Sequence, residues 1–163
     1  MTDRKVELLV PAGSLEVLKV AVDYGADAVY IGGQAYGLRA KADNFSIDEM
    51  KEAAAYAHAK NAKVYVTANI FAHNYDIDGM KTYFEQLKDT GVDAVLVSDP
   101  GIFTLAKETM PDMELHISTQ ANNTNYLTYN FWYKLGAKRV VTARELSLAE
   151  IRQIRDHIPD DME

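Results

Sequence analysis

A short sequence motif recurs along this chain and constrains its fold more than any other feature. It reads GADAV at residues 25–29, GVDAV at 91–95 and GAKRV at 136–140, and NAKV at 61–64 is a variant without glycine. Gly and Asn readily adopt the left-handed backbone conformation that ends a helix, and the Val-rich residues that follow suit a buried parallel strand. Each copy therefore predicts the end of a helix and the start of a strand, so the chain is a series of β/α units.

Helix-start signals lie between the predicted strands. Ser46 with Glu49 and Ser147 with Glu150 match the S-x-x-E capping box that begins a helix. Other helices are expected to begin after Ser14, at Asp76 or Asp78, after Pro100 and after residues 122–125. The six predicted strands cover roughly residues 7–11, 28–32, 63–68, 94–98, 114–118 and 139–143.

Six β/α units fall short of a (β/α)₈ barrel, which has eight units and usually about 250 residues. An open, doubly wound sheet is the alternative, but that fold usually carries a G-x-G-x-x-G turn after its first strand, where this chain has PAGS at 11–14. We therefore expect an incomplete TIM-type (β/α) barrel of about six parallel units, truncated before strand seven, with residues 1–163 as the N-terminal part of the barrel domain. Two unpaired strand edges would then favour self-association.

The amino-acid composition limits which kinds of protein and which kinds of functional site this chain can form. With 163 residues, 48% of them apolar, the chain can form one domain with a core, and no apolar run is long enough for a membrane span or a secretion signal. A cytoplasmic protein is therefore expected. The chain has no Cys, which excludes disulfides, a thiolate nucleophile and a thiolate-held cluster built from these residues alone. The formal charge of −7 argues against a general polyanion-binding surface, although it leaves room for a local basic pocket.

The parallel strands of a barrel end at one face, where binding and catalytic side chains gather. The polar residues at the predicted strand ends are mostly neutral amides and hydroxyls with two cations, which suit a carboxylate, a phosphate or a nucleobase edge better than a metal ion. The amides of Asn69 and Gln120 could read base edges or peptide groups, or else cap the loops that follow. The expected substrate-binding residues are Arg39, Asn69, Ser118, Thr119, Gln120, Arg144 and Glu145.

The two arginines among these residues are placed to clamp an anion through paired hydrogen bonds. For Arg39, which lies in a long loop, plain solvent exposure is the alternative. For Arg144 the alternative is an ion pair with Asp99 or Glu145 that stabilises the rim of the barrel. Asp99 itself, before Pro-Gly, is expected to begin a helix.

The sequence shows no set of nucleophile, base and orienting group. His116 and Ser118 share one face of a predicted strand, but side chains two apart on a strand point in parallel and hydrogen-bond poorly. Lys63 and Lys138 precede their strands, at the opposite end from the expected site, which disfavours Schiff-base chemistry. The residues assign no catalytic role, and no grouped ligands such as H-E-x-x-H indicate a metal.

Several motifs together carry a resemblance that covers essentially the whole chain. They are ELLVPAGS at 7–14, GADAVYIGG at 25–33, Arg39 with NF at 44–45, Asn69, GVDA at 91–94, STQ at 118–120 and RELS at 144–147. In their order and spacing the sequence resembles the collagenase-like peptidases of unassigned catalytic type, family thirty-two. That family also includes bacterial RNA-hydroxylation and ubiquinone-hydroxylation proteins, and its pattern continues with a glycine and cysteine segment that this chain lacks.

The resemblance implies that the complete protein is an RNA-modifying enzyme of the tRNA uridine hydroxylation type, with RNA or a small anionic co-substrate at the barrel mouth. In hydroxylating members the later cysteines are associated with an iron–sulfur cluster. The resemblance therefore implies no cofactor within this segment and a cluster held by cysteines beyond residue 163. The alternatives are a peptidase acting on collagen-like or other peptides, and an inert barrel that binds a small metabolite. These 163 residues alone are expected to be inactive.

Overall fold

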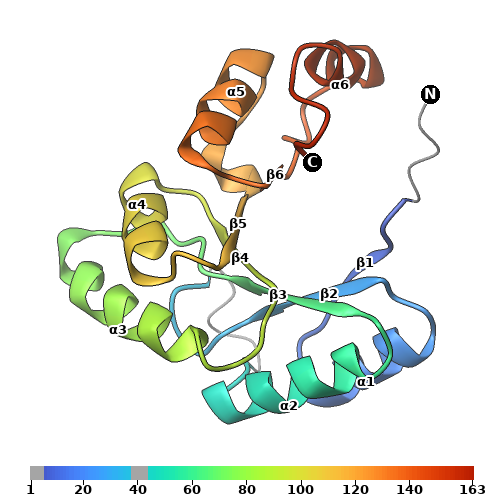
Figure 1. The fold of residues 1–163 in the computed structure, drawn as a ribbon, viewed down its shortest axis with the longest axis vertical. Coiled ribbons are helices and arrows are strands. Elements are labelled where there is room, and N and C mark those ends of the chain that lie inside the picture. Colours follow the sequence, from blue (N-terminus) through green and yellow to red (C-terminus); the bar gives the residue numbers. More distant parts are fainter. Residues whose placement is uncertain (1–5, 38–43) are drawn as a thin grey trace.

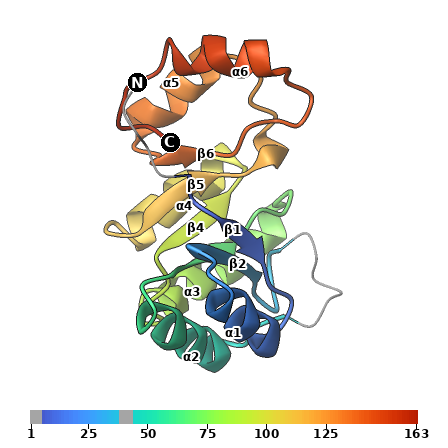
Figure 2. The same cartoon turned by 90° about the vertical axis from the view of Figure 1, so that its right-hand side faces the viewer.

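The computed structural model describes residues 6–37 and 44–163, which form six β/α units in chain order (Figures 1 and 2). The first units contain β1 (Leu9–Pro11), α1 (Leu15–Asp23), β2 (Ala28–Gly32), α2 (Ile47–His58), β3 (Lys63–Thr67), the short helix η1 (Asn74–Asp76) and α3 (Ile77–Leu87). The remaining units contain β4 (Ala94–Val97), α4 (Pro100–Thr109), β5 (Glu114–Ile117), η2 (Thr119–Ala121), α5 (Tyr126–Leu135), β6 (Arg139–Val140) and α6 (Leu148–Arg155).

All six strands are parallel and lie in sequence order, β1-β2-β3-β4-β5-β6. The sheet curls, with the helices on its outer side and its concave side open (Figure 1). Parallel strands need a crossover between them, and right-handed crossovers place successive helices on one side of a curling sheet. The structure thus confirms the predicted incomplete barrel of six parallel β/α units.

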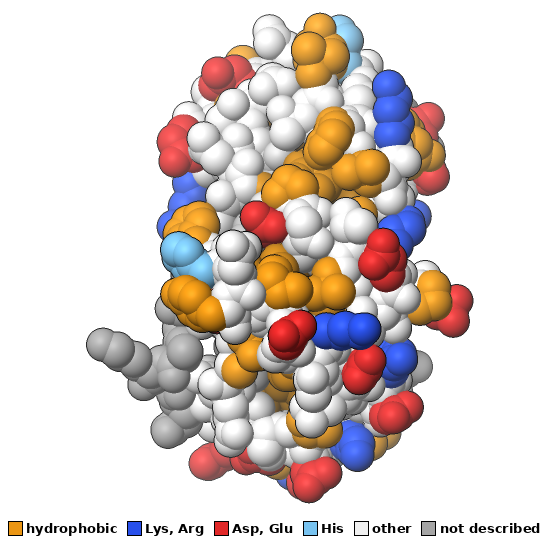
Figure 3. Space-filling view, turned by 90° about the vertical axis from the view of Figure 1, so that its left-hand side faces the viewer, with side chains coloured by type: hydrophobic (Ala, Val, Ile, Leu, Met, Phe, Trp, Pro, Cys, Tyr) orange, Lys and Arg blue, Asp and Glu red, His pale blue; other side chains and the backbone are white. Residues whose placement is uncertain are grey.

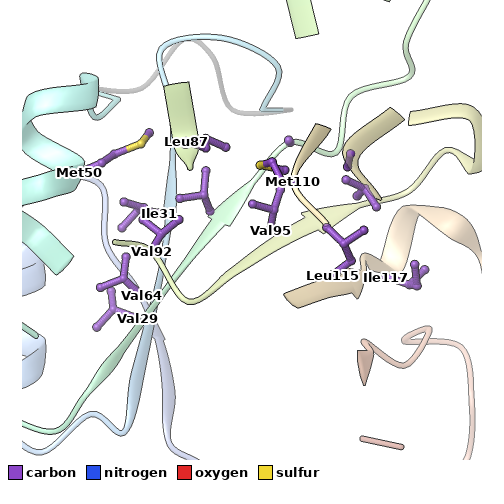
Figure 4. Close-up of a cluster of buried hydrophobic side chains, with 14 of the residues drawn as sticks. Val29, Ile31, Met50, Val64, Leu87, Val92, Val95, Met110, Leu115 and Ile117 are labelled. Carbon is purple, nitrogen blue, oxygen red and sulfur yellow. The ribbon is translucent and has the colours of Figure 1, made fainter. Parts of the chain in front are cut away.

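The strands bury side chains on both faces of the sheet. Toward the helices, residues such as Val29, Ile31, Val64 and Val95 pack with side chains of the helices and of the loops between elements in the main core (Figure 4). Toward the concave side, a smaller cluster consists of Ala28, Tyr65, Ala94 and Leu96, with Leu9, Tyr30 and Val141 packed against it. Because successive strand residues point to opposite faces, burial of both faces requires the nearly continuous apolar runs seen in the sequence.

The recurring motif has the left-handed backbone conformation that the sequence predicts. The residue that opens each copy has a positive φ: 94° at Gly25, 60° at Asn61, 80° at Gly91 and 95° at Gly136. Both predicted capping boxes are present, at Ser46 and Ser147. Side-chain oxygens of Ser14, Asp99 and Asn125 also cap α1, α4 and α5.

We expect Gly25→Ala to lower the free energy of unfolding by about 1–2 kcal/mol, because an L-residue with a side chain is strained in the left-handed region. A Cβ at Gly25 would meet no atom within 4 Å, so the cost isolates the backbone strain. Gly13→Ala is the matched control, since a Cβ there also meets no atom within 4 Å and its φ is not in that region. Urea unfolding of the unmodified protein and the two variants measures the effect. Equal unfolding midpoints for Gly25→Ala and Gly13→Ala would contradict this explanation of the recurring motif.

The two outer strands are shorter than predicted, because each has only one neighbouring strand to hold its backbone. At β6 the backbone N–H of Val140 donates to the carbonyl of Glu163 (2.8 Å), and the N–H of Glu163 donates to the carbonyl of Lys138 (3.1 Å). These two bonds follow the pattern of a parallel ladder. The expectation of an entirely unpaired edge is therefore wrong at β6, while self-association stays a prediction.

Charged side chains join the two outer strands at the end of the sheet where the strands begin. The Arg139 guanidinium on β6 donates to both carboxylate oxygens of Glu7, just before β1, at 2.6 and 3.3 Å. The Tyr65 hydroxyl donates to the same carboxylate (2.9 Å), and the Arg139 guanidinium lies 5.3 Å from the Tyr65 ring centroid. Arg139 also pairs with Glu163. The curl of the sheet thus brings residues 132 positions apart into contact.

The outer face carries acidic, basic and apolar side chains side by side, without a large field of positive charge (Figure 3). On α5, the side chains of Leu127, Phe131 and Leu135 are spaced four residues apart and exposed. Within the described part of the chain, no helix has the length and apolar character that crossing a membrane requires.

Candidate ligand-binding site

A cavity of about 300 Å³ opens at the end of the sheet where the strands end, on the concave side that faces the viewer in Figure 2. Apolar side chains of Leu9, Tyr30, Leu96 and Val141 form part of its wall. The remaining wall is mostly polar side chains and glycines from the residues that end or follow the strands. The cavity therefore has the mixture typical of small-molecule sites, an apolar lining with a few convergent polar groups.

Four polar side chains of the wall form one hydrogen-bond network. The Asn69 amide nitrogen donates to Ser118 Oγ (2.9 Å) and to Gln120 Oε1 (3.0 Å). The hydroxyls of Ser118 and Thr119 also donate to Gln120 Oε1, the latter at 3.4 Å. The network joins the end of β3 to the end of β5 and links the orientation of one amide to that of the other.

Backbone bonds hold these residues in place. The N–H of Ala68 donates to the carbonyl of Leu96 (2.8 Å), and the N–H of Ser118 donates to that of Val97 (2.7 Å). The Ser98 hydroxyl also donates to the carbonyl of Asn69 (3.2 Å). Asn69 and Ser118 are buried. Because these side chains are already held in place, binding a ligand would not require the entropy cost of ordering them.

Arg144 lies at the rim of the same cavity and is exposed. No ion pair to Arg144 occurs among residues 6–37 and 44–163, and Asp99 instead accepts the N–H of Ile102 (2.9 Å) at the start of α4. The predicted alternative, an ion pair with Asp99 or Glu145, is therefore wrong. The Arg144 guanidinium is available to an anionic group in the cavity.

The other two predicted site residues are not part of this constellation. Glu145 is exposed and does not line the cavity. Arg39 lies outside the residues that the structure describes. The structure thus brings five of the seven predicted residues to one cavity: Asn69, Ser118, Thr119, Gln120 and Arg144.

Sequence reasoning missed part of the wall, formed by the ends of β2 and β3. Thr67 lines the cavity, and its hydroxyl donates to the carbonyl of Ile31 (3.2 Å). Gly32 also lines it, and a Cβ there would lie only 3.0 Å from the Asn44 side-chain oxygen. The position of Thr67 at the end of a predicted strand was the available signal. The close approach at Gly32 depends on the following loop, which has no periodic pattern.

His116 precedes the network on β5, but none of its hydrogen bonds among the described residues reaches the network. His116 is buried and its Nε2 lies 2.7 Å from Glu114 Oε1, and its ring meets the Tyr65 ring edge-on at 4.9 Å. The hydrogen bond from His116 lowers the pKa of Glu114 below its ordinary value, against the effect of burial. No hydrogen bond joins His116 to Ser118 among the described residues, so the geometry provides no serine–histidine pair.

The comparisons with known proteins agree with the resemblance seen in the sequence. The chain is 48% identical over 160 residues to the "tRNA hydroxylation protein P1" of Bacillus subtilis and 43% identical over 159 residues to the "tRNA hydroxylation protein P" of Escherichia coli. These alignments cover 98% and 96% of this chain but only 38% and 34% of the two relatives. The chain thus spans about a third of the length of the relatives that it matches.

Among solved structures, a U32 peptidase is similar to 98% of this chain with a TM-score of 0.76, and the match covers 68% of that structure. A phosphonopyruvate hydrolase in complex with oxalate and Mg²⁺ matches 97% of the chain with a TM-score of 0.64. Their sequence identities of 17% and 14% show a common fold and no more. Residues 13–163 match the family described as "Peptidase family U32", and we conclude that this chain belongs to that family.

Proposed function

We propose that the chain is the N-terminal part of the barrel domain of an RNA-modifying enzyme of the tRNA uridine hydroxylation type, which works in the cytoplasm. The cavity would hold part of the RNA substrate or a small anionic co-substrate. The names of the two bacterial relatives support the reaction class. As the chain matches only part of their length, the activity is proposed for the complete protein.

The observation that carries this proposal is the chemistry of the cavity wall. Fixed neutral amides and hydroxyls stand beside the Arg144 guanidinium, which makes no ion pair with the residues that the structure describes, at the strand ends where barrel enzymes place their sites. Neutral amides bind base edges, and a guanidinium binds phosphate or carboxylate. The mixed charges of the outer face favour the concave side as the place where RNA is bound (Figure 3).

A redox centre would have to be held elsewhere in the complete protein. The chain has no Cys, and its described residues contain no group of three or more His, Asp or Glu side chains that could hold a metal ion. The residues present therefore do not fit an iron–sulfur cluster, whose usual ligands are Cys thiolates. We place such a cluster on cysteines beyond residue 163.

Hydrolysis of peptides, the alternative suggested by the family name, receives less support from the side chains. Ser118 shares its hydrogen bonds with Asn69 and Gln120, and His116 is held by Glu114. Neither arrangement activates a nucleophile. The two functions also make opposite demands on the wall, because a peptidase needs a base beside its nucleophile and a base-binding pocket needs fixed amides.

Deletion of the gene for the complete protein tests the proposal. Mass spectrometry of nucleosides from total tRNA should show the loss of a hydroxylated uridine, and a plasmid copy should restore it. Iron and sulfide in the purified, oxygen-sensitive protein would support the redox centre. Unchanged nucleosides, together with hydrolysis of peptides by the purified protein, would reject the proposal in favour of a peptidase.

Self-association of the 163-residue chain is a separate expectation. The outer edge of β1 and the apolar stripe of Leu127, Phe131 and Leu135 on α5 are available for contact with a second copy. Light scattering at increasing protein concentration should show a mass above 18.2 kDa. A constant monomer mass at high concentration would contradict this expectation.

A further inference from the structure

The hydrogen bonds of the cavity wall determine which atoms remain for a ligand. Gln120 Oε1 accepts from the Asn69 amide and from the hydroxyls of Ser118 and Thr119. The oxygen of Gln120 is therefore fully used, and the hydroxyl proton of Ser118 is committed to it. What Gln120 still offers is its amide nitrogen, a hydrogen-bond donor.

Asn69 is committed in the opposite sense. Its amide nitrogen donates to both Ser118 Oγ and Gln120 Oε1, and because these two oxygens are hydrogen-bonded to each other, a single N–H of Asn69 is shared between them. Its side-chain oxygen remains, and this atom is a hydrogen-bond acceptor. Among the described residues, the side-chain polar atoms that are both enclosed and unpaired are Tyr83 Oη and Asn123 Nδ2. Asn69 Oδ1 and Gln120 Nε2 therefore keep contact with open space, and both side chains line the cavity.

We propose that Asn69 and Gln120 together read a neutral ligand edge that carries one hydrogen-bond donor beside one acceptor, the edge of a pyrimidine base. This inference rests on the proposed function and assigns the base of the substrate to one wall of the cavity. Uracil offers N3–H beside O4, which complements Asn69 Oδ1 and Gln120 Nε2. Rotation of both amides by half a turn keeps their mutual bond and still presents one donor and one acceptor.

The same wall discriminates against anions. A carboxylate or fully ionised phosphate group only accepts hydrogen bonds, so it would leave the oxygen of the mostly buried Asn69 facing another acceptor. An anionic group of the ligand is assigned to Arg144, whose guanidinium is unpaired within the described part of the chain. The apolar side chains of Leu9, Leu96 and Val141 complete a surface on which a flat ring can pack. The cavity of about 300 Å³ is large enough for one base.

Ser118 has a positioning role in this arrangement. Its oxygen accepts from Asn69 and its hydroxyl donates to Gln120, so it holds both amides in one relative orientation. Within the described part of the chain, the Ser118 side chain makes no other hydrogen bond, and Ser118→Ala would free the amides to rotate. The arrangement explains why three polar residues, Ser118, Thr119 and Gln120, follow one another at this strand end.

Calorimetric binding of uridine 5′-monophosphate (UMP) and N3-methyl-UMP to the full-length protein tests the inference. The methyl group removes the N3–H donor and leaves the phosphate and ribose unchanged. The unmodified protein should bind UMP about tenfold more tightly than the methylated nucleotide. Gln120→Glu keeps an acceptor for the three incoming hydrogen bonds but replaces the free donor by an oxygen, so the ratio of the two dissociation constants should fall to about one.

Gln86→Glu is the matched control, because it makes the same charge change at an exposed position on the outer face of α3. This variant should keep the tenfold ratio. Equal binding of the two nucleotides by the unmodified protein, no UMP binding at millimolar concentration, or an unchanged ratio in Gln120→Glu would overturn the inference. Loss of the tRNA modification on gene deletion would then still support the proposed function. If the protein prefers UMP over N3-methyl-UMP but gene deletion leaves the tRNA nucleosides unchanged, the proposed function would be rejected. The inference that Asn69 and Gln120 bind a pyrimidine edge would then still stand.

Discussion

Replacement of Arg139 by Met is expected to lower the free energy of unfolding by roughly 2–3 kcal/mol, between the values for exposed and for fully buried ion pairs. The guanidinium is mostly buried, with 16% of its side chain exposed, and it bridges Glu7 and Glu163 over the Tyr65 ring. Without it, the Glu7 carboxylate would remain partly buried without its cation. The contact that joins β6 to the residue preceding β1 would also be lost. Urea unfolding at neutral pH measures the change.

The pH dependence of stability identifies the cause. Burial alone would raise the pKa of Glu7, but the hydrogen bonds from Arg139 and Tyr65 lower it below its ordinary value of 4.5. The stability supplied by ionised Glu7 is therefore complete above pH 4.5 and is lost as the pH falls through the lowered pKa. In Arg139→Met the acid-side loss should be less steep. Arg152→Met, at an exposed position on α6, should behave like the unmodified protein, and equal effects of the two substitutions would contradict the bridge.

Replacement of Arg144 by Ala is expected to reduce the hydroxylated nucleoside in tRNA at least tenfold while the melting temperature stays unchanged. A charged hydrogen bond to a ligand contributes about 1.5–3 kcal/mol, which corresponds to a tenfold or larger loss. Stability should not change, because the exposed guanidinium makes no ion pair within residues 6–37 and 44–163. The measurement is nucleoside mass spectrometry in a deletion strain that carries the variant gene.

Arg152→Ala is the control for this experiment, since it removes an arginine from an exposed position outside the cavity. The control should restore the modification fully. A large fall in the melting temperature of Arg144→Ala would indicate a structural role. Full restoration by Arg144→Ala would remove Arg144 from the binding site.

The sequence predicts features of this structure that depend on a few neighbouring residues. Gly25, Asn61, Gly91 and Gly136 adopt a positive φ between a helix and the next strand because of their own backbone freedom, and this could be recognised from the recurring motif. The gathering of Asn69, Ser118 and Gln120 was also predictable, since parallel strands end at one edge of the sheet.

Features that depend on the curl of the sheet could not be predicted in this way. The contact between Arg139 and Glu7 requires β6 to approach β1 across the open side of the barrel, and no local pattern specifies that approach. The direction of each amide in the cavity likewise follows from three-dimensional neighbours, because Asn69 and Gln120 lie 51 positions apart. The sequence leaves open whether Arg144 forms an ion pair with Asp99. In the structure the Asp99 carboxylate instead caps α4, and Arg144 makes no ion pair with the described residues.

Photo-crosslinking of 4-thiouridine-substituted tRNA to the full-length protein tests most directly whether the strand-end cavity is the RNA site. Mass spectrometry of the digested complex locates the crosslinked residues. We predict crosslinks in residues 68–73, 119–125 and 142–147, which follow β3, β5 and β6 at the cavity end of the sheet. Crosslinks confined to residues 24–27, 60–62, 110–113 and 136–138, which precede the strands at the opposite end, would contradict the proposed site.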